Sequence, residues 1–216
     1  MRLELNRIAK AYRDGASTRQ VLADLDASFE AGGLTAVTGP SGIGKSTLLA
    51  IAGGMTKPDT GTVRFISAGE RRTPIGYRNV SWIFQTNNLL HNRSALDNVA
   101  IALMSVGSSR QAAEYRGHIA LEDVDLGDIS NTLVSKLSGG ERQRVAVARA
   151  LVRPGSVILA DEPTAQLDRS NASAIGKSLV VAAKNHIVVV ASHDPVISDY
   201  AATVLYLRNG RLWAGG

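Results

Sequence analysis

A glycine-rich segment between an apolar run and a helical run constrains this chain more than any other feature. Residues 39–46 read GPSGIGKS and fit the pattern G-x-x-x-x-G-K-[ST]. They follow Leu34–Thr38, an apolar run that predicts a buried strand, and they precede residues 46–52, which predict a helix ended by Gly53 and Gly54. A strand, a glycine-rich loop and a helix in this order predict a phosphate-binding loop.

Each part of this pattern has a chemical task. Glycines let backbone N–H groups turn toward phosphate oxygens, and the following helix directs its positive end at the same anion. Lys45 would reach the β- and γ-phosphates, Ser46 would place its hydroxyl on Mg²⁺, and Thr47 would contact the α-phosphate. A glycine-rich turn into an ordinary helix is the alternative, but it needs neither Lys45 nor Ser46. The predicted nucleotide ligands of the loop are Gly39, Ser41, Gly42, Gly44, Lys45, Ser46 and Thr47.

Two adjacent carboxylates follow a second strand of buried type. Residues 157–160 are apolar, and Asp161 and Glu162 come directly after them. Because neighbouring side chains on a strand point in opposite directions, the two carboxylates can divide two tasks. In P-loop ATPases an aspartate at the end of such a strand holds Mg²⁺, which leaves Glu162 to orient and deprotonate the attacking water. Without the phosphate-binding loop, a solvated turn or a helix cap would explain the same pair.

The hydrophobic pattern predicts an α/β fold. Residues 157–160 and Ile187–Ala191 share with Leu34–Thr38 a continuous apolar character rich in β-branched residues. Parallel strands covered by helices on both faces have this character.

Alternation elsewhere predicts antiparallel structure. Within residues 24–30, Leu25 and Phe29 lie on the side opposite the polar residues, which predicts a half-buried antiparallel strand. Within residues 204–213, Asn209 and Gly210 separate two apolar stretches, and this dipeptide favours a type I′ hairpin turn.

A helical pattern interrupts the strands between about residues 87 and 136. Ser94 can cap one helix, and Ser108 or Ser109 can cap another. The segment is therefore predicted to be an inserted helical lobe.

Composition excludes several classes of protein. The 216 residues are 44% hydrophobic and 20% charged, as in an ordinary globular domain. The absence of cysteine excludes disulfides, zinc–thiolate sites and thiol catalysis. The formal charge of +5 suits a nucleotide, a nucleic acid, an anionic membrane or a solvated basic face. No apolar run approaches the ~18–20 residues of a membrane span, and the first ten residues lack a secretory signal, so we expect a cytoplasmic chain.

A second glycine pair opens another predicted helix. Residues 137–143 read LSGGERQ and precede a helical run at residues 144–152. Ser138 and Glu141 have the spacing of a capping box, so a well-started helix explains the segment structurally. Gly139 and Gly140, however, expose the backbone at a positive helix end, an arrangement suited to a second phosphate contact.

With this segment the chain resembles the ABC ATPase family along nearly its whole length. Residues 137–143 match the family signature, and residues 165–168 occupy the position of its D-loop. Tyr12 stands at the position of the adenine-stacking aromatic residue, Gln85 at that of the Q-loop glutamine, and His193 at that of the switch histidine. Singly, these three are also explained as a strand aromatic, a surface glutamine and a core histidine. That all these elements follow one another in the family order supports the resemblance.

The resemblance implies one ABC ATPase domain over residues 1–216 that binds ATP and Mg²⁺. Its fold would be α/β, with a P-loop NTPase (RecA-like) core, an N-terminal antiparallel β subdomain, and an inserted helical subdomain at residues 87–153 that includes the signature helix. It also implies a head-to-tail homodimer, in which each ATP lies between one phosphate-binding loop and the partner's signature residues. Those residues would be Ser138, Gly139 and Gly140.

The same resemblance implies roles for the remaining residues. Gln85 would touch Mg²⁺ or the water and report to a membrane subunit, His193 would hold the γ-phosphate, and Asp168 would couple the two sites. The expected catalytic residues are Glu162, His193, Gln85 and Lys45, and the expected metal ligands are Ser46, Gln85 and Asp161. Ala165, Gln166 and Ser192 depart from the residues more often found at their positions, which leaves the tightness of coupling between subunits open.

The chain looks most like the ATPase subunits of macrolide-efflux, lipoprotein-release, haem-efflux and cell-division systems. We therefore expect an exporter subunit at the cytoplasmic face of the membrane, bound peripherally to an integral membrane permease near residues 87–102. A cell-division type of signalling module without cargo is the alternative. A third possibility, a soluble ATPase acting on ribosomes or nucleic acid, rests on the basic charge alone, and we expect no nucleic-acid partner.

Overall fold

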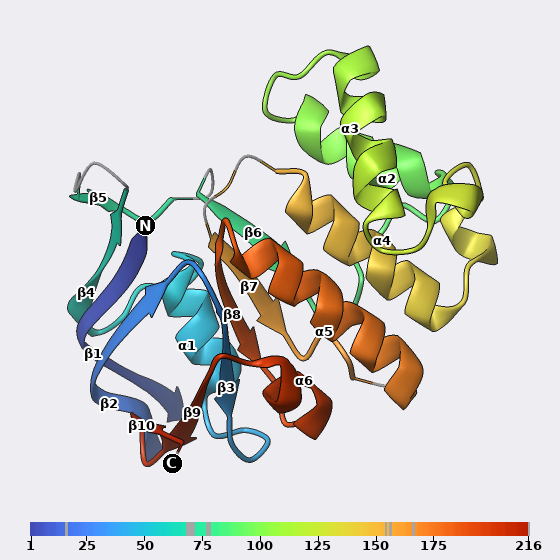
Figure 1. Ribbon diagram of the computed structural model, residues 1–216. Helices are drawn as coiled ribbons and strands as arrows, with labels where there is room; N and C mark the ends of the chain where they lie inside the picture. The colour runs from blue at the N-terminus through green and yellow to red at the C-terminus, as the bar shows by residue number, and fades with distance from the viewer. Residues whose placement is uncertain are drawn as a thin grey trace.

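The computed structural model describes residues 1–15, 17–67, 72–76, 79–153, 155, 157–165 and 167–215, and it places them in two sheets and a helical lobe (Figure 1). The larger sheet is parallel except for one strand at its edge. Its strands are, in spatial order, β10 (Arg211–Ala214), β9 (Thr203–Arg208), β3 (Leu34–Thr38), β8 (Ile187–Ala191), β7 (Val157–Asp161) and β6 (Val80–Ile83).

The three continuous apolar runs are confirmed as the central strands β3, β7 and β8. Every residue of β8 is buried. Alternate residues of β7 belong to two separate hydrophobic clusters, with Ile158 in one and Leu159 in the other. One cluster reaches α5 (Arg169–Ala183), α6 (Pro195–Tyr200) and the helical lobe, and the other reaches α1 (Lys45–Ala52) and the smaller sheet. The sheet is therefore covered on both faces, as its composition predicts.

The smaller sheet is antiparallel. Its strand order is β2 (Ser17–Glu30), β1 (Arg2–Asp14), β4 (Thr60–Ile66) and β5 (Arg72–Pro74). The predicted alternation in β2 is confirmed, since Leu25 and Phe29 are buried while Asp24, Asp26 and Glu30 are exposed.

A hairpin joins the two sheets. Asn209 and Gly210, between β9 and β10, have φ angles of 51° and 73°, which confirms the left-handed pair of a type I′ turn. The Ala23 N–H on β2 donates a hydrogen bond to Gly210 O at 2.9 Å. The smaller sheet is thereby held beside the edge of the larger one.

The helical lobe contains α2 (Ala95–Met104), α3 (Arg110–Glu122) and α4 (Gly139–Leu151). Serines cap all three helices: Ser94 and Ser138 in capping boxes, and Ser109 through a bond from the Ala112 N–H. The lobe does not have a core of its own, because buried residues of α2 and α4 share one hydrophobic cluster with the larger sheet. In the described part of the chain, no helix combines the length and the apolar character needed to cross a membrane.

Candidate functional site

The predicted site residues from four separate segments meet at the carboxyl edge of the larger sheet. The phosphate-binding loop follows β3, Gln85 follows β6, Glu162 follows β7 and His193 follows β8. Parallel strands end at the same edge, which is where open α/β sheets bind their ligands.

The phosphate-binding loop is shaped by its glycines and by Lys45. Gly39, Gly42 and Gly44 have φ angles of 149°, 72° and 118°, a region that favours glycine. Gly44 also has no space for a side chain, because a Cβ atom would lie 2.4 Å from Val21 Cγ1. The Lys45 ammonium group turns back into the loop and donates to Gly39 O at 2.8 Å and to Pro40 O at 3.3 Å. The side chain is 6% exposed, so the loop largely encloses this charge.

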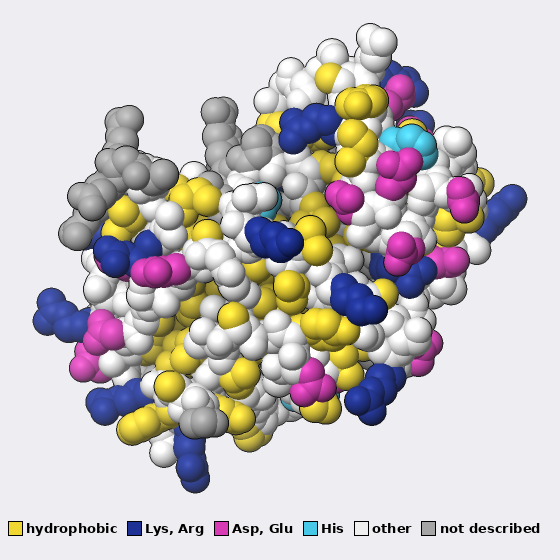
Figure 2. Space-filling model, in the orientation of Figure 1, with side chains coloured by type: hydrophobic (Ala, Val, Ile, Leu, Met, Phe, Trp, Pro, Cys, Tyr) yellow, Lys and Arg dark blue, Asp and Glu magenta, His cyan; other side chains and the backbone are white. Residues whose placement is uncertain are grey.

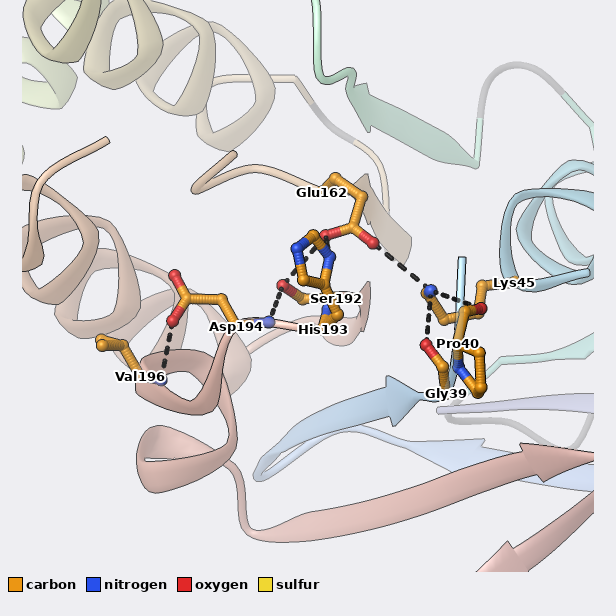
Figure 3. A network of polar contacts seen from close by, with 8 residues as sticks. All are labelled: Gly39, Pro40, Lys45, Glu162, Ser192, His193, Asp194 and Val196. Atoms are coloured by element: carbon orange, nitrogen blue, oxygen red, sulfur yellow. Dashed lines mark hydrogen bonds and ion pairs between the residues drawn. The ribbon is translucent and has the colours of Figure 1, made fainter. Parts of the chain in front are cut away.

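Glu162 lies at the centre of a polar network (Figure 3). Its Oε1 atom is 3.4 Å from Lys45 Nζ. Its Oε2 atom is 3.0 Å from Nδ1 of His193 and accepts a hydrogen bond from the Ser192 hydroxyl at 3.2 Å. The backbone N–H of His193 also donates to Oε2, at 3.3 Å. The structure therefore brings the predicted base, Lys45 and His193 into one cluster.

The pKa values of the adjacent carboxylates shift in opposite directions. Burial raises the pKa of Asp161; the Ser46 hydroxyl opposes this shift, and the charge of Glu162 adds to it. Burial also acts to raise the pKa of Glu162, but hydrogen bonds from His193, with the charges of His193 and Lys45, outweigh it and lower that pKa. Glu162 is thus held in its charged form, as a proton acceptor requires.

Asp161 has the features of a cation ligand. Its Oδ1 atom is buried and has no hydrogen-bond partner among the described residues. A buried carboxylate oxygen without a partner is costly, and a cation would satisfy it. Ser46 interacts with Asp161, and Ser46 and Gln85 both line the adjoining cleft. These oxygen-bearing side chains fit Mg²⁺, which prefers oxygen ligands.

A cleft of about 490 Å³ leads from Glu162 to the smaller sheet. Tyr12 lies at this cleft on β1 and is 44% exposed, with the Lys10 ammonium group over its ring at 5.5 Å from the centroid. Sequence reasoning missed two residues here: Arg19, whose Nη2 donates to Gly42 O at 2.8 Å, and Val21. Only the strand register, which pairs Arg19 with Tyr12, could have indicated them. The predicted residues that line the cleft are Tyr12, Ser41, Gly42, Gly44, Lys45, Ser46, Thr47, Gln85 and Glu162.

The signature residues do not belong to this cleft. Ser138, Gly139 and Gly140 form the start of α4 in the helical lobe, where Ser138 and Gly139 are exposed. Asp168 instead caps α5, accepting the Asn171 N–H at 2.8 Å. Within one chain, therefore, the predicted nucleotide residues form two separate groups. Gln166 lies outside the described residues.

Two further residues were not predicted to act at the site. Ser192 is 3% exposed, and its Oγ atom both donates to Glu162 and accepts the Asp194 N–H at 3.1 Å. Arg149 on α4 contacts the segment after Gln85. Neither has a sequence signal of its own, because each contact joins segments far apart in the chain.

Comparisons with known proteins agree with this arrangement. A family model described as ABC transporter matches residues 22–165. The chain is 38% identical over 221 residues to the lipoprotein-releasing system ATP-binding protein LolD of Shewanella oneidensis, covering 97% of this chain and 95% of LolD. It is 35% identical over 224 residues to the macrolide export ATP-binding/permease protein MacB 1 of Yersinia pestis, covering 98% of this chain and 34% of MacB 1.

A solved structure shares the fold. It is the dimeric structure of a post-hydrolysis state of the ATP-binding cassette MJ0796 bound to ADP and Pi. The TM-score is 0.83 at 29% identity, and the alignment covers 97% of this chain and 96% of the cassette.

Proposed function

Because the chain belongs to the ABC transporter family, we propose that it is an ATPase subunit that closes as a homodimer around two ATP–Mg²⁺ and drives a separate membrane permease. The observation that carries this proposal is the Lys45–Glu162–His193 cluster, of which Lys45 and Glu162 line the same cleft as Tyr12. The cluster brings together an ammonium group that would bind phosphate (Lys45), a charged base (Glu162) and a histidine (His193).

Competition for Lys45 connects nucleotide binding to the base. The ammonium group of Lys45 contacts Glu162 Oε1 at 3.4 Å. Phosphate oxygens that enter the loop compete for the same ammonium group, which leaves Oε1 free to accept a proton from water. The Ser192 hydroxyl and the backbone N–H of His193 still hold Oε2, so the carboxylate keeps its orientation. His193, which is 63% exposed on its side chain, can then turn toward the γ-phosphate.

Asp161, Ser46 and Gln85 would hold Mg²⁺. When bound, the ion supplies positive charge to the phosphate oxygens during cleavage. The three side chains contribute position: Asp161 from the end of β7, Ser46 from the start of α1 and Gln85 from the segment after β6. Gln85 is thus placed to link the state of the site to the helical lobe that follows it in the chain.

A second copy would complete the nucleotide site. Ser138 and Gly139 are exposed at the start of a helix, yet they lie outside the cleft of their own chain. Free backbone N–H groups at a helix start bind anions. They would contact the nucleotide held by the partner, as would Gly140, and Asp168 would couple the two sites.

The membrane subunit would dock on the helical lobe. Figure 2 shows apolar side chains exposed over this lobe, next to charged ones. Leu90, Ile101 and Met104 are 43–48% exposed and line a depression of about 270 Å³. Arg93 and Asp97 lie in the same depression, so a partner segment of mixed apolar and charged character fits it. The chain would act peripherally at the cytoplasmic face of the membrane, in an export system of the LolD or MacB kind.

The test uses Glu162→Gln, which retains the shape of the side chain and removes the base. Loss of a general base lowers turnover by about 10²- to 10⁴-fold. We expect this variant to bind ATP, to accumulate as a dimer, and to bring a membrane protein with it from native membranes. Ser138→Arg should block the dimer, because it places bulk and charge at the interface.

Turnover near the unaltered rate in Glu162→Gln would reject the assigned base, and recovery of ribosomes without a membrane protein would reject the transporter role. ATP-stimulated transport by the captured complex in vesicles separates export from signalling. A complex that hydrolyses ATP and moves none of the lipoprotein, macrolide, haem or peptide cargoes supports the cell-division alternative.

A further inference from the structure

The two glycines of the signature segment have different surroundings. Gly139 is exposed, and a Cβ atom built on it would have no neighbour within 4 Å. Gly140 is buried, and its Cβ would lie 2.6 Å from Oδ1 and 2.7 Å from Cγ of Asn171, at the start of α5. The first glycine is open to a partner, whereas the second is packed against another helix of its own chain.

The Asn171 side chain uses both ends of its amide group. Oδ1 accepts a hydrogen bond from Arg144 Nη1 on α4 at 2.8 Å. Nδ2 donates to Oδ2 of Asp168 at 2.8 Å, while the Asn171 backbone N–H donates to the other oxygen of that carboxylate. One amide therefore joins the start of the signature helix to the capping residue of α5.

Charged groups strengthen the hydrogen bonds of Asn171 to Arg144 and Asp168. The backbone and amide N–H groups of Asn171 lower the pKa of Asp168, and the backbone N–H of Ser170 and then the charge of Arg144 lower it further. The charge of Arg144 also acts on Glu141, the capping-box partner of Ser138. Within the described residues, Arg144 Nε is buried without a hydrogen-bond partner, whereas Nη1 of the same guanidinium group donates to Asn171. A charged donor makes such a bond stronger than a neutral one.

We propose that Asn171 is a positioning residue that fixes the signature residues 138–140 to Asp168, so that both surfaces meet a second copy of the chain as one rigid unit. The inference rests on the dimer of the proposed function. Two surfaces that are already fixed to each other lose less conformational freedom on association than two that move separately. Asn171 thus favours dimer closure without touching the nucleotide of its own chain, since it lies outside the cleft.

The direct test is Asn171→Ala in the Glu162→Gln chain, with ATP-dependent dimer formation followed by sedimentation velocity. Loss of the two side-chain hydrogen bonds of Asn171, partly compensated by water, should weaken the dimer roughly tenfold. Binding of a fluorescent ADP analogue to the monomer should change less than about twofold, because the cleft is intact. Asn185→Ala, an exposed site just beyond the end of the same helix, is the matched control and should change neither.

Three outcomes are distinct. A weaker dimer with unchanged monomer binding supports the role of Asn171. An equally strong dimer in Asn171→Ala and Asn185→Ala overturns it and leaves the proposed function intact. If the parent Glu162→Gln chain does not dimerise with ATP, the proposed dimer fails and this inference fails with it.

Gly140→Ala tests the same contact between α4 and Asn171 by changing α4 instead of Asn171. The new methyl group would displace the Asn171 amide, so the dimer should weaken while Asn171 is present. In the Asn171→Ala chain no amide group is present to be displaced, so adding Gly140→Ala should weaken the dimer by less than about a further twofold. Equal losses in both backgrounds would show that Gly140 does not act through Asn171 and would overturn the inference.

Discussion

Arg149 should contribute strongly to stability because it holds an irregular segment beside the site. From the last turn of α4, its Nη1 donates to Asn88 O at 2.7 Å and its Nη2 to Asn87 O at 3.0 Å. Asn88 has a φ angle of 45°, so this part of the chain turns in a conformation that few non-glycine residues adopt. The two nitrogens of the guanidinium fork fix adjacent carbonyls of that turn.

The contacts give the size of the effect. A hydrogen bond from a charged donor contributes about 1.5–3 kcal/mol, so two give about 3–6 kcal/mol as an upper figure. Arg149 is only partly buried, and water will replace part of each bond in a variant. A cation in the last helical turn adds about 0.3–1 kcal/mol, whereas the helix propensities of arginine and alanine are similar. Arg149→Ala should therefore lower the free energy of unfolding by about 2–4 kcal/mol.

Urea denaturation without nucleotide, followed by tryptophan fluorescence, measures this change. Arg149→Lys should fall between the alanine variant and the unaltered chain, because one ammonium group replaces the two donor nitrogens of the fork. Arg116→Ala, at an exposed position of α3, should stay within about 0.5 kcal/mol of the unaltered chain. If Arg149→Ala unfolds at the same midpoint as Arg116→Ala, the two carbonyl contacts do not stabilise the fold and this reasoning is wrong.

Three shorter predictions concern the site. Ser192→Ala should lower kcat about tenfold at unchanged KM. It should also move the acid limb of the pH–rate profile to higher pH, because loss of the hydrogen bond from Ser192 raises the pKa of Glu162. Ser192→Thr should restore both kcat and the profile, and an unchanged profile in Ser192→Ala would exclude a role for this hydroxyl group. Gly53→Ala should cost about 1–3 kcal/mol in urea denaturation, since its Cβ would lie 2.4 Å from Trp82 Cζ2, and a neutral result would show that the ring moves freely. Asp161→Asn should abolish Mg²⁺-dependent turnover while nucleotide binding without Mg²⁺ persists, as equilibrium titration with EDTA can show; full Mg²⁺-dependent turnover would exclude Asp161 as a ligand.

Local parts of the structure could be predicted from the sequence, because their signals lie within a few residues. The phosphate-binding loop with its strand and helix, the serine caps at Ser94 and Ser138, and the Asn209-Gly210 turn all depend on neighbouring residues, and the structure confirms them. The strand β4 gave no signal, since its residues are mostly exposed at one end and buried at the other instead of alternating.

The contacts that complete the site could not be predicted in this way. Lys45 and Glu162 lie far apart in the sequence, and only the order of the strands brings their charges within 3.4 Å. The same holds for Asn171, which meets Arg144 because α5 follows β7 and packs beside α4. The carboxylate pair beside the phosphate-binding loop predicted the role of Glu162, and the family resemblance that of His193. Neither indicated the contact of Lys45 with Glu162 or the bond from Ser192.

The position of β3 in the larger sheet affects how the chain folds during synthesis. Its two neighbours in that sheet, β8 and β9, begin only at Ile187 and Thr203, whereas β3 begins at Leu34. Until they emerge from the ribosome, an apolar strand remains without backbone partners, and pairing over such a long sequence separation is slow. The nascent chain should therefore need protection of Leu34–Thr38, by a chaperone or by its own smaller sheet. A phosphate-binding loop that is translated early becomes able to hold nucleotide only after residues 187–208 have also been made.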